Sequence, residues 1–105
     1  MSVREEEIVA VWSTWALFQD MGNPRKYSRM PGYMRQQAAA MAVDMMALRW
    51  NTASKDNLKS TLDRGRQLVY SLLVPSETPG IPREVRERAR RVCKHYPLLL
   101  DERGY

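Results

Sequence analysis

The chain has 105 residues, one cysteine and a formal net charge of +5 at pH 7. This length predicts a single domain, residues 1–105, that buries roughly 65% of its unfolded surface without disulfides. One cysteine excludes an internal disulfide framework, and the glutamates at residues 5–7 do not fit a secretory signal, so we expect a cytoplasmic protein. The positive charge favours anionic partners and says nothing about the fold.

The first half of the chain predicts two helices. Apolar residues recur at intervals of three and four over residues 3–19, and Ser2 with Glu5 forms a capping box ahead of them. A segment rich in proline and glycine follows, after which Pro31 is placed as the first residue of a second helix. That helix is expected to run to about Trp50.

The second half predicts two more helices, over residues 55–73 and 82–96. Gly65 interrupts the first of them and allows a close helix crossing, and Pro97 ends the second. The longest apolar stretch covers residues 38–48, well short of the ~20 residues that span a bilayer, so no membrane partner is expected. No segment has the alternation of a strand. The sequence therefore predicts an all-α fold of four helices in two stacked hairpins.

When the chain is aligned with itself at an offset of 51 residues, three residues with the same spacing coincide. They are a proline, a second proline seven residues later and an arginine four residues after that. The coincident identities are Leu17 and Leu68, Pro24 and Pro75, Pro31 and Pro82, Arg35 and Arg86, Ala38 and Ala89, and Leu48 and Leu99. Any two amphipathic helices can be aligned by sliding one along the other, but helical periodicity does not generate the prolines. We therefore predict an internal duplication with pseudo-repeats over about residues 3–50 and 54–100.

The segment 82–95 carries a row of cations. A helical projection puts its apolar residues on one face and its basic residues on the other, in solvent. Acidic residues four positions ahead of Arg88 and Arg91 predict the ion pairs Glu84–Arg88 and Glu87–Arg91. The candidate contacts to an anion or a partner are Arg29, Arg35, Arg83, Arg86, Arg90 and Lys94.

These cations need not bind a partner. A charged helix face is most often only solvated. Arg35 and Arg86, which each follow a helix-opening proline by four residues, have a structural alternative, in which they reach the neighbouring loop or an acid such as Asp63 or Asp20 and fix each hairpin.

The segments "GRQLVYSLL" and "IPREVRERARRVCKHYP", within residues 58–97, resemble a family of short uncharacterised proteobacterial proteins. Its members pair an amphipathic helix with the pattern P-x-x-V-R-x-x-A-R-R-L-L-R-H-Y-P. The matching residues are Pro82, Val85, Arg86, Ala89, Arg90, Arg91, Lys94, His95, Tyr96 and Pro97, with Val92 and Cys93 in place of the two leucines. The resemblance carries no activity and implies an association with phages and mobile elements.

The residues give no support to an enzyme. Cys93 and His95 are the only thiol and imidazole, and a spacing of two on a helix points them in different directions. One histidine and one cysteine without a carboxylate cluster do not make a metal site, and no glycine-rich phosphate loop is present. We expect no cofactor and no small-molecule substrate.

The second predicted helix carries more apolar surface than one stripe, so it must be covered on more than one side. The cover is either the remaining helices or an interface, since methionine and aromatic residues suit interfaces. The candidate interface residues are Trp12, Tyr33, Met34, Met46 and Trp50. We predict a non-enzymatic helical protein that binds a protein partner or a second copy, with nucleic-acid binding through the helix over 82–95 as the alternative.

Overall fold

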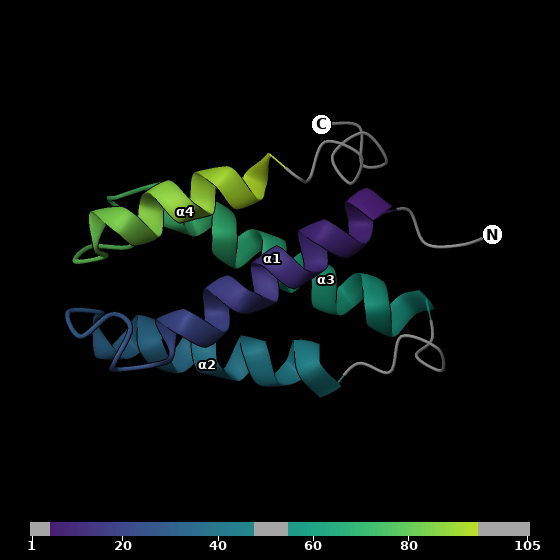
Figure 1. Ribbon diagram of the computed structural model, residues 1–105, viewed down its shortest axis with the longest axis horizontal. Helices are drawn as coiled ribbons and strands as arrows, with labels where there is room; N and C mark the ends of the chain where they lie inside the picture. The colour runs from purple at the N-terminus through teal and green to yellow at the C-terminus, as the bar shows by residue number, and fades with distance from the viewer. Residues whose placement is uncertain (1–4, 48–54, 95–105) are drawn as a thin grey trace.

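The computed structural model describes residues 5–47 and 55–94, with their side chains over 11–47 and 59–94. Four helices account for the regular structure of these residues, and their order is α1 (Glu5–Met21), α2 (Gly32–Ala47), α3 (Lys55–Leu72) and α4 (Arg83–Cys93). Figure 1 traces them along the chain. The all-α prediction is confirmed, while the predicted helix ends near Trp50 and Tyr96 lie outside the described residues.

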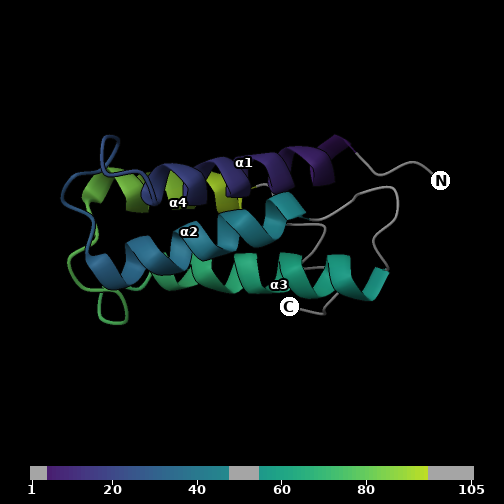
Figure 2. The ribbon, with the colours of Figure 1, turned by 90° about the horizontal axis from the view of Figure 1, so that it is seen from below.

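The helices pack as two hairpins. α1 lies against α2 and α3 against α4, and further contacts of α1 with α3 and α4, and of α2 with α3, join the hairpins. The first loop (residues 22–31) and the second loop (residues 73–82) lie at the same end of the molecule (Figures 1 and 2). The Tyr33 hydroxyl donates a hydrogen bond of 2.9 Å to the Pro79 carbonyl and so ties the start of α2 to the second loop. The predicted pair of helical hairpins is confirmed.

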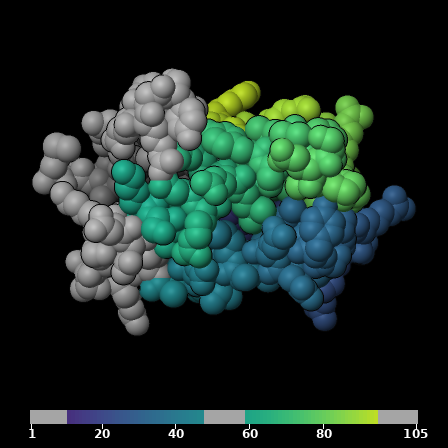
Figure 3. Space-filling view, turned by 180° about the vertical axis from the view of Figure 1, so that it is seen from behind, coloured from purple at the N-terminus to yellow at the C-terminus, as the bar shows by residue number. Residues whose placement is uncertain are grey.

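One core is shared by both hairpins. Its largest fully buried side chains come from all four helices and are Leu17, Phe18, Met21, Met34, Val69, Leu72 and Val85. α4 illustrates the cause, because it buries Val85, Ala89 and Val92 at intervals of four and three while its other positions before Cys93 are arginine and glutamate. Burial of this apolar stripe, at about 25 cal/mol per Å², is what holds so charged a helix on the protein. From behind, the second loop and the first hairpin meet on the surface (Figure 3).

Both helix-opening prolines stand one residue outside their helices, rather than at the first helical position. Pro82 is the N-cap of α4, with φ −58° and ψ 145° and no side-chain cap hydrogen bond. Its carbonyl accepts from the backbone N–H of Arg86 at 3.3 Å, and the Pro31 carbonyl accepts from that of Arg35 at 2.9 Å. A proline can take this place because its missing N–H leaves no unpaired donor at the helix start.

The two loops are built alike. Several backbone hydrogen bonds of the first loop recur 51 residues later, for example Tyr27 N–H to Asn23 O at 3.3 Å and Thr78 N–H to Val74 O at 3.3 Å. Buried apolar residues also recur at this offset. These pairs are Phe18 and Val69, Met21 and Leu72, Met30 and Ile81, Met34 and Val85, Ala38 and Ala89, and Met41 and Val92. The correspondence follows the predicted offset, and the duplication itself stays a prediction.

Two glycines meet neighbouring helices at different distances. A Cβ at Gly65 would lie 3.5 Å from Phe18 Cε2 and 3.7 Å from Met45 Sδ, which are ordinary contacts. A Cβ at Gly22 would lie 3.0 Å from Ala39 Cβ and 3.2 Å from its backbone Cα. Of these two, Gly22 sits at the closer approach of chain segments, where the first loop leaves α1 and passes α2.

We expect opposite effects from two alanine substitutions at these glycines. Gly65→Ala should raise the free energy of unfolding by roughly 0.5–1 kcal/mol, because the methyl group fits and glycine is a poor helix former. Gly22→Ala should lower it by about 1–3 kcal/mol, because the methyl group crowds Ala39. Urea unfolding of both variants measures the difference, and a loss of stability in Gly65→Ala would contradict the packing described.

Candidate functional site

Arg86 turns away from solvent and binds the second loop. Its Nη1 donates to the Leu72 carbonyl at 2.7 Å and to Thr78 Oγ1 at 3.0 Å, and its Nη2 donates to the Thr78 carbonyl at 2.5 Å. The Thr78 hydroxyl itself lies within hydrogen-bond distance of the carbonyls of Ser71 and Val74, at 3.0 and 3.2 Å. A single guanidinium thus satisfies several polar atoms around the loop, and we call this arrangement the Arg86 clasp.

Arg35 binds the first loop in the same way. Its Nη2 donates to the Tyr27 carbonyl at 2.7 Å and to the Met30 carbonyl at 3.4 Å. Tyr27 and Thr78 stand 51 residues apart, as do Arg35 and Arg86, so each arginine holds the equivalent carbonyl of its own loop. The Arg35 clasp is the weaker one, since its Nη1 is buried without a hydrogen-bond partner.

These contacts change the set of candidate cations. The expectation that Arg86 lies on a solvent-facing row is wrong, because its position at the edge of the apolar stripe lets the long side chain fold back onto the loop. The structural alternative for Arg35 and Arg86, a reach to the neighbouring loop, is confirmed. Neither guanidinium is presented to a partner.

We expect Arg86→Gln to lower the free energy of unfolding by about 2 kcal/mol, because hydrogen bonds from a charged donor contribute ~1.5–3 kcal/mol and glutamine is too short to reach both carbonyls. Arg90→Gln, which removes the same charge from an exposed position of α4, is the matched control and should stay within ~0.5 kcal/mol of the wild type. Urea unfolding measures both. Equal stability of the two variants would contradict the clasp.

Arg88 fastens α4 to the first hairpin. Its Nη1 donates to the Asp20 carboxylate at 2.6 Å and to the Tyr27 hydroxyl at 3.3 Å. Burial by itself lowers the pKa of Arg88, but the hydrogen bonds to Tyr27 and Asp20 outweigh it and the pKa is raised. The guanidinium therefore stays charged and belongs to the structure rather than to an outside ligand.

The predicted ion pairs within α4 are replaced by others. Glu87 pairs with Arg83 at 3.0 Å instead of Arg91, and Arg88 is occupied by Asp20 instead of Glu84. Glu87 has an arginine four residues away on either side, so spacing alone does not choose its partner. The Arg83 side chain is 90% exposed, and such a pair contributes little to stability.

Among the described residues, six exposed cations of the first loop and the α4 segment have no acidic partner within ion-pair distance. They are Arg25, Lys26, Arg29, Arg90, Arg91 and Lys94. The sequence assigns Arg91 to an ion pair with Glu87, so Arg91 was missed as a free cation. The signal that was available is the equal spacing of Arg83 and Arg91 from Glu87.

An apolar hollow opens at the other end of the molecule. It is lined by Val11, Trp12 and Trp15 of α1 and by Met45 and Met46 of α2, and we call these five residues the apolar face, of which Val11 and Met45 also belong to the buried core. The Trp12 and Trp15 rings meet edge to face, with centroids 5.7 Å apart and planes at 88°. Trp12 is 56% exposed and Met46 is 72% exposed, whereas core residues of these types would be covered.

The structure separates the other predicted interface residues. Met34 is 1% exposed and belongs to the core, so its place in the predicted interface is wrong. Tyr33 is partly exposed, but its hydroxyl is bound to Pro79 at the loop end of the molecule. Trp50 lies outside the described residues. Trp15 was missed as a member of the face, although the three-residue step from Trp12 to Trp15 signals one shared helix face.

The described residues hold no group of three side chains that could bind a metal ion. Cys93 is half-buried, and burial raises the pKa of its thiol to about 11. His95, the other half of the pair considered in the sequence, lies outside the described residues. A thiol with a raised pKa is mostly protonated at neutral pH and is a poor nucleophile.

We expect Cys93 to react slowly with iodoacetamide. At pH 8 its thiolate fraction should be about 100-fold below that of a thiol with the ordinary value of 9.0, because the pKa of about 11 is two pH units higher. Since the thiolate is the reacting form, the rate should rise about tenfold per pH unit up to the pKa. The same chain unfolded in guanidinium chloride is the control, and equal folded and unfolded rates would contradict the burial.

None of the helices, over the residues that the structure describes, combines the length and apolarity needed to cross a bilayer. Comparison of the chain with protein-family models, with curated proteins and with solved structures finds no match.

Proposed function

We propose that this chain is a non-enzymatic helical interaction protein that binds a protein partner through its apolar face. The observation that supports this function best is the hollow between α1 and α2, with Trp12 and Met46 exposed at its walls. Exposed apolar surface that borders a hollow is typical of docking sites, because it is costly to leave in water.

The composition of the face fits a protein partner. Tryptophan contributes large buried area at interfaces, and methionine adapts its unbranched side chain to the surface it meets. Val43, about one turn before Met46 on α2, is 66% exposed and extends the apolar surface along the helix. The expected occupant is an apolar side chain that enters the hollow, supplied by an apolar helix or loop of the partner.

A second copy of the chain is the first partner to test. Trp12 and Met46 line the hollow and are also exposed. Because a two-fold interface brings the same patch of each copy together, these side chains of one copy would meet the hollow of the other. The proposal includes a cytoplasmic location, which rests on the single cysteine. It also includes an accessory role for a phage or mobile element, which rests only on the resemblance of residues 58–97.

We expect Met46→Asp to abolish self-association, or capture of a partner, without unfolding the chain. Met46 is largely exposed, so the substitution should change the free energy of unfolding by less than ~0.5 kcal/mol, while a charge beside the hollow opposes apolar docking. Sedimentation equilibrium over about 1–100 µM covers the range of weak to moderate dimers. Partners captured by tagged wild type and by Met46→Asp are compared in parallel.

Val74→Asp is the matched control, because Val74 is an exposed apolar residue of the second loop, away from the hollow. It should bind as the wild type does. The proposed function is contradicted if the wild type stays monomeric and every protein that it captures is also captured by Met46→Asp. Equal loss of binding in both variants would show a general effect of charge and would also contradict it.

A further inference from the structure

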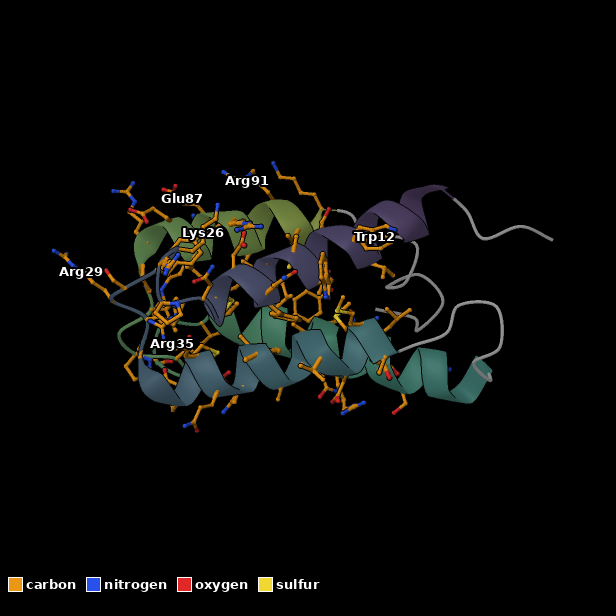
Figure 4. The ribbon with its side chains drawn as sticks, turned by 60° about the horizontal axis from the view of Figure 1, so that its bottom comes forward. Trp12, Lys26, Arg29, Arg35, Glu87 and Arg91 are labelled. Atoms are coloured by element: carbon orange, nitrogen blue, oxygen red, sulfur yellow. The ribbon has the colours of Figure 1, made fainter. Side chains whose placement is uncertain are left out.

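A second surface is built where the first loop lies beside α4. The bonds from Arg88 to Asp20 and Tyr27 hold the end of α1 and the middle of that loop against the middle of α4. Lys26 precedes Tyr27 in the chain and is exposed. Figure 4 shows Lys26 in the same region as Glu87 and Arg91, with Arg29 extending from the loop nearby. Residues distant in sequence thus contribute cations to one side of the molecule.

The arginines of this region divide into two groups. Arg35, Arg86 and Arg88 bind loop carbonyls or Asp20 and are internal to the fold. The remaining cations of the first loop and the α4 segment are exposed, and we call them the cationic surface. They are Arg25, Lys26, Arg29, Arg83, Arg90, Arg91 and Lys94.

The cationic surface keeps a strong net charge. The surface has seven cations, and α4 also carries two glutamates, Glu84 and Glu87, so that seven positive charges less two negative ones leave +5. Glu87 neutralises Arg83 by direct contact. Elsewhere in the described side chains the exposed cations are Lys59 and Arg64 of α3, and Arg64 is paired with Asp44. The positive charge of this part of the chain is therefore concentrated, and it favours an anionic partner.

The geometry favours an extended polyanion over a small anion. The cations of this surface are exposed side chains spread over the first loop and the α4 segment, and such a spread suits a ligand with many charges. From Arg83 to Lys94 the helix rises about 16 Å at ~1.5 Å per residue. That length matches about five phosphates of one DNA strand at ~3.4 Å per phosphate along the duplex axis.

An anionic membrane is the less suitable polyanion. Helices that bind membrane surfaces combine basic residues with apolar residues that insert beside them. Here the exposed Trp12 lies toward the opposite end of the molecule from Lys26 and Arg29 (Figure 4). The polar side of α4 is purely charged, which suits phosphate contacts in water.

We propose that the cationic surface binds the phosphate backbone of nucleic acid without reading its sequence. The loops over residues 22–31 and 73–82 are longer than the ~3–4-residue turn of a helix-turn-helix, so neither hairpin forms that groove-reading motif. The exposed arginines and lysines contact phosphates by charge, and release of counterions supplies the affinity. This binding is independent of the apolar face.

The test is the salt dependence of binding to a fluorescent DNA duplex of about 20 base pairs, followed by anisotropy over about 50–200 mM NaCl. We expect the wild type to bind at the lowest salt. The double variant Arg90→Gln/Arg91→Gln should bind at least about tenfold more weakly at 100 mM salt, and its log–log salt slope should be about 1.8 units shallower, for two lost contacts at ~0.9 each. Lys26→Gln/Arg29→Gln should give a similar loss.

The matched control is Lys59→Gln/Arg64→Gln, which removes the same charge from exposed positions of α3. It should bind within about threefold of the wild type, and Met46→Asp should bind unchanged, which separates this proposal from the proposed function. Thermal melting confirms that each variant is folded. No duplex binding at about 50 mM salt, or an equal loss in the α3 control, overturns the proposal. So does preferential binding to phosphatidylserine vesicles, or competition by polyglutamate as effective as by DNA.

Discussion

The two proline loops depend on one kind of interaction, a guanidinium that donates to backbone carbonyls. Each loop leaves carbonyl groups without helical partners, and such groups are costly when they are removed from water. Arg86 meets this need through Leu72 and Thr78, and Arg35 does so through Tyr27 and Met30. Each clasp thereby ties the start of the second helix of its hairpin to the loop that precedes it. The contact between Tyr33 and the second loop, and the position of the first loop's cations beside α4, depend on these loops.

The helices and their pairing could be predicted from the sequence because apolar spacing and proline placement are local signals. The direction of the arginine side chains could not. A helical projection places Arg86 with the exposed cations, but its side chain is long enough to return to the loop. Arg88 shows a second limit, because its partner Asp20 is 68 positions away and the local Glu84 is an equally suitable acid. The close approach at Gly22 depends on the crossing of α1 and α2, which no local pattern encodes.

The apolar face and the cationic surface lie at different places for a reason that starts in the core. α2 is apolar on more than one side, and its partners in the core cover only the side that carries residues such as Met34 and Met45. Val43 and Met46 are left in solvent near the far end of the helix. The loop end, by contrast, carries basic residues, of which only some bind the loop carbonyls or Asp20.

The spacing of the clasps along the chain also suggests an order of assembly. Arg35 lies eight residues from Tyr27, and Arg86 eight residues from Thr78, so each hairpin holds its own clasp partners within a short segment. The Arg88–Asp20 pair closes a loop of 68 residues, which costs more chain entropy. Local contacts form faster than distant ones. During synthesis, all residues of the Arg35 clasp are therefore present before α4 has been made. The core-facing apolar side of the first hairpin stays exposed until the second hairpin packs against it.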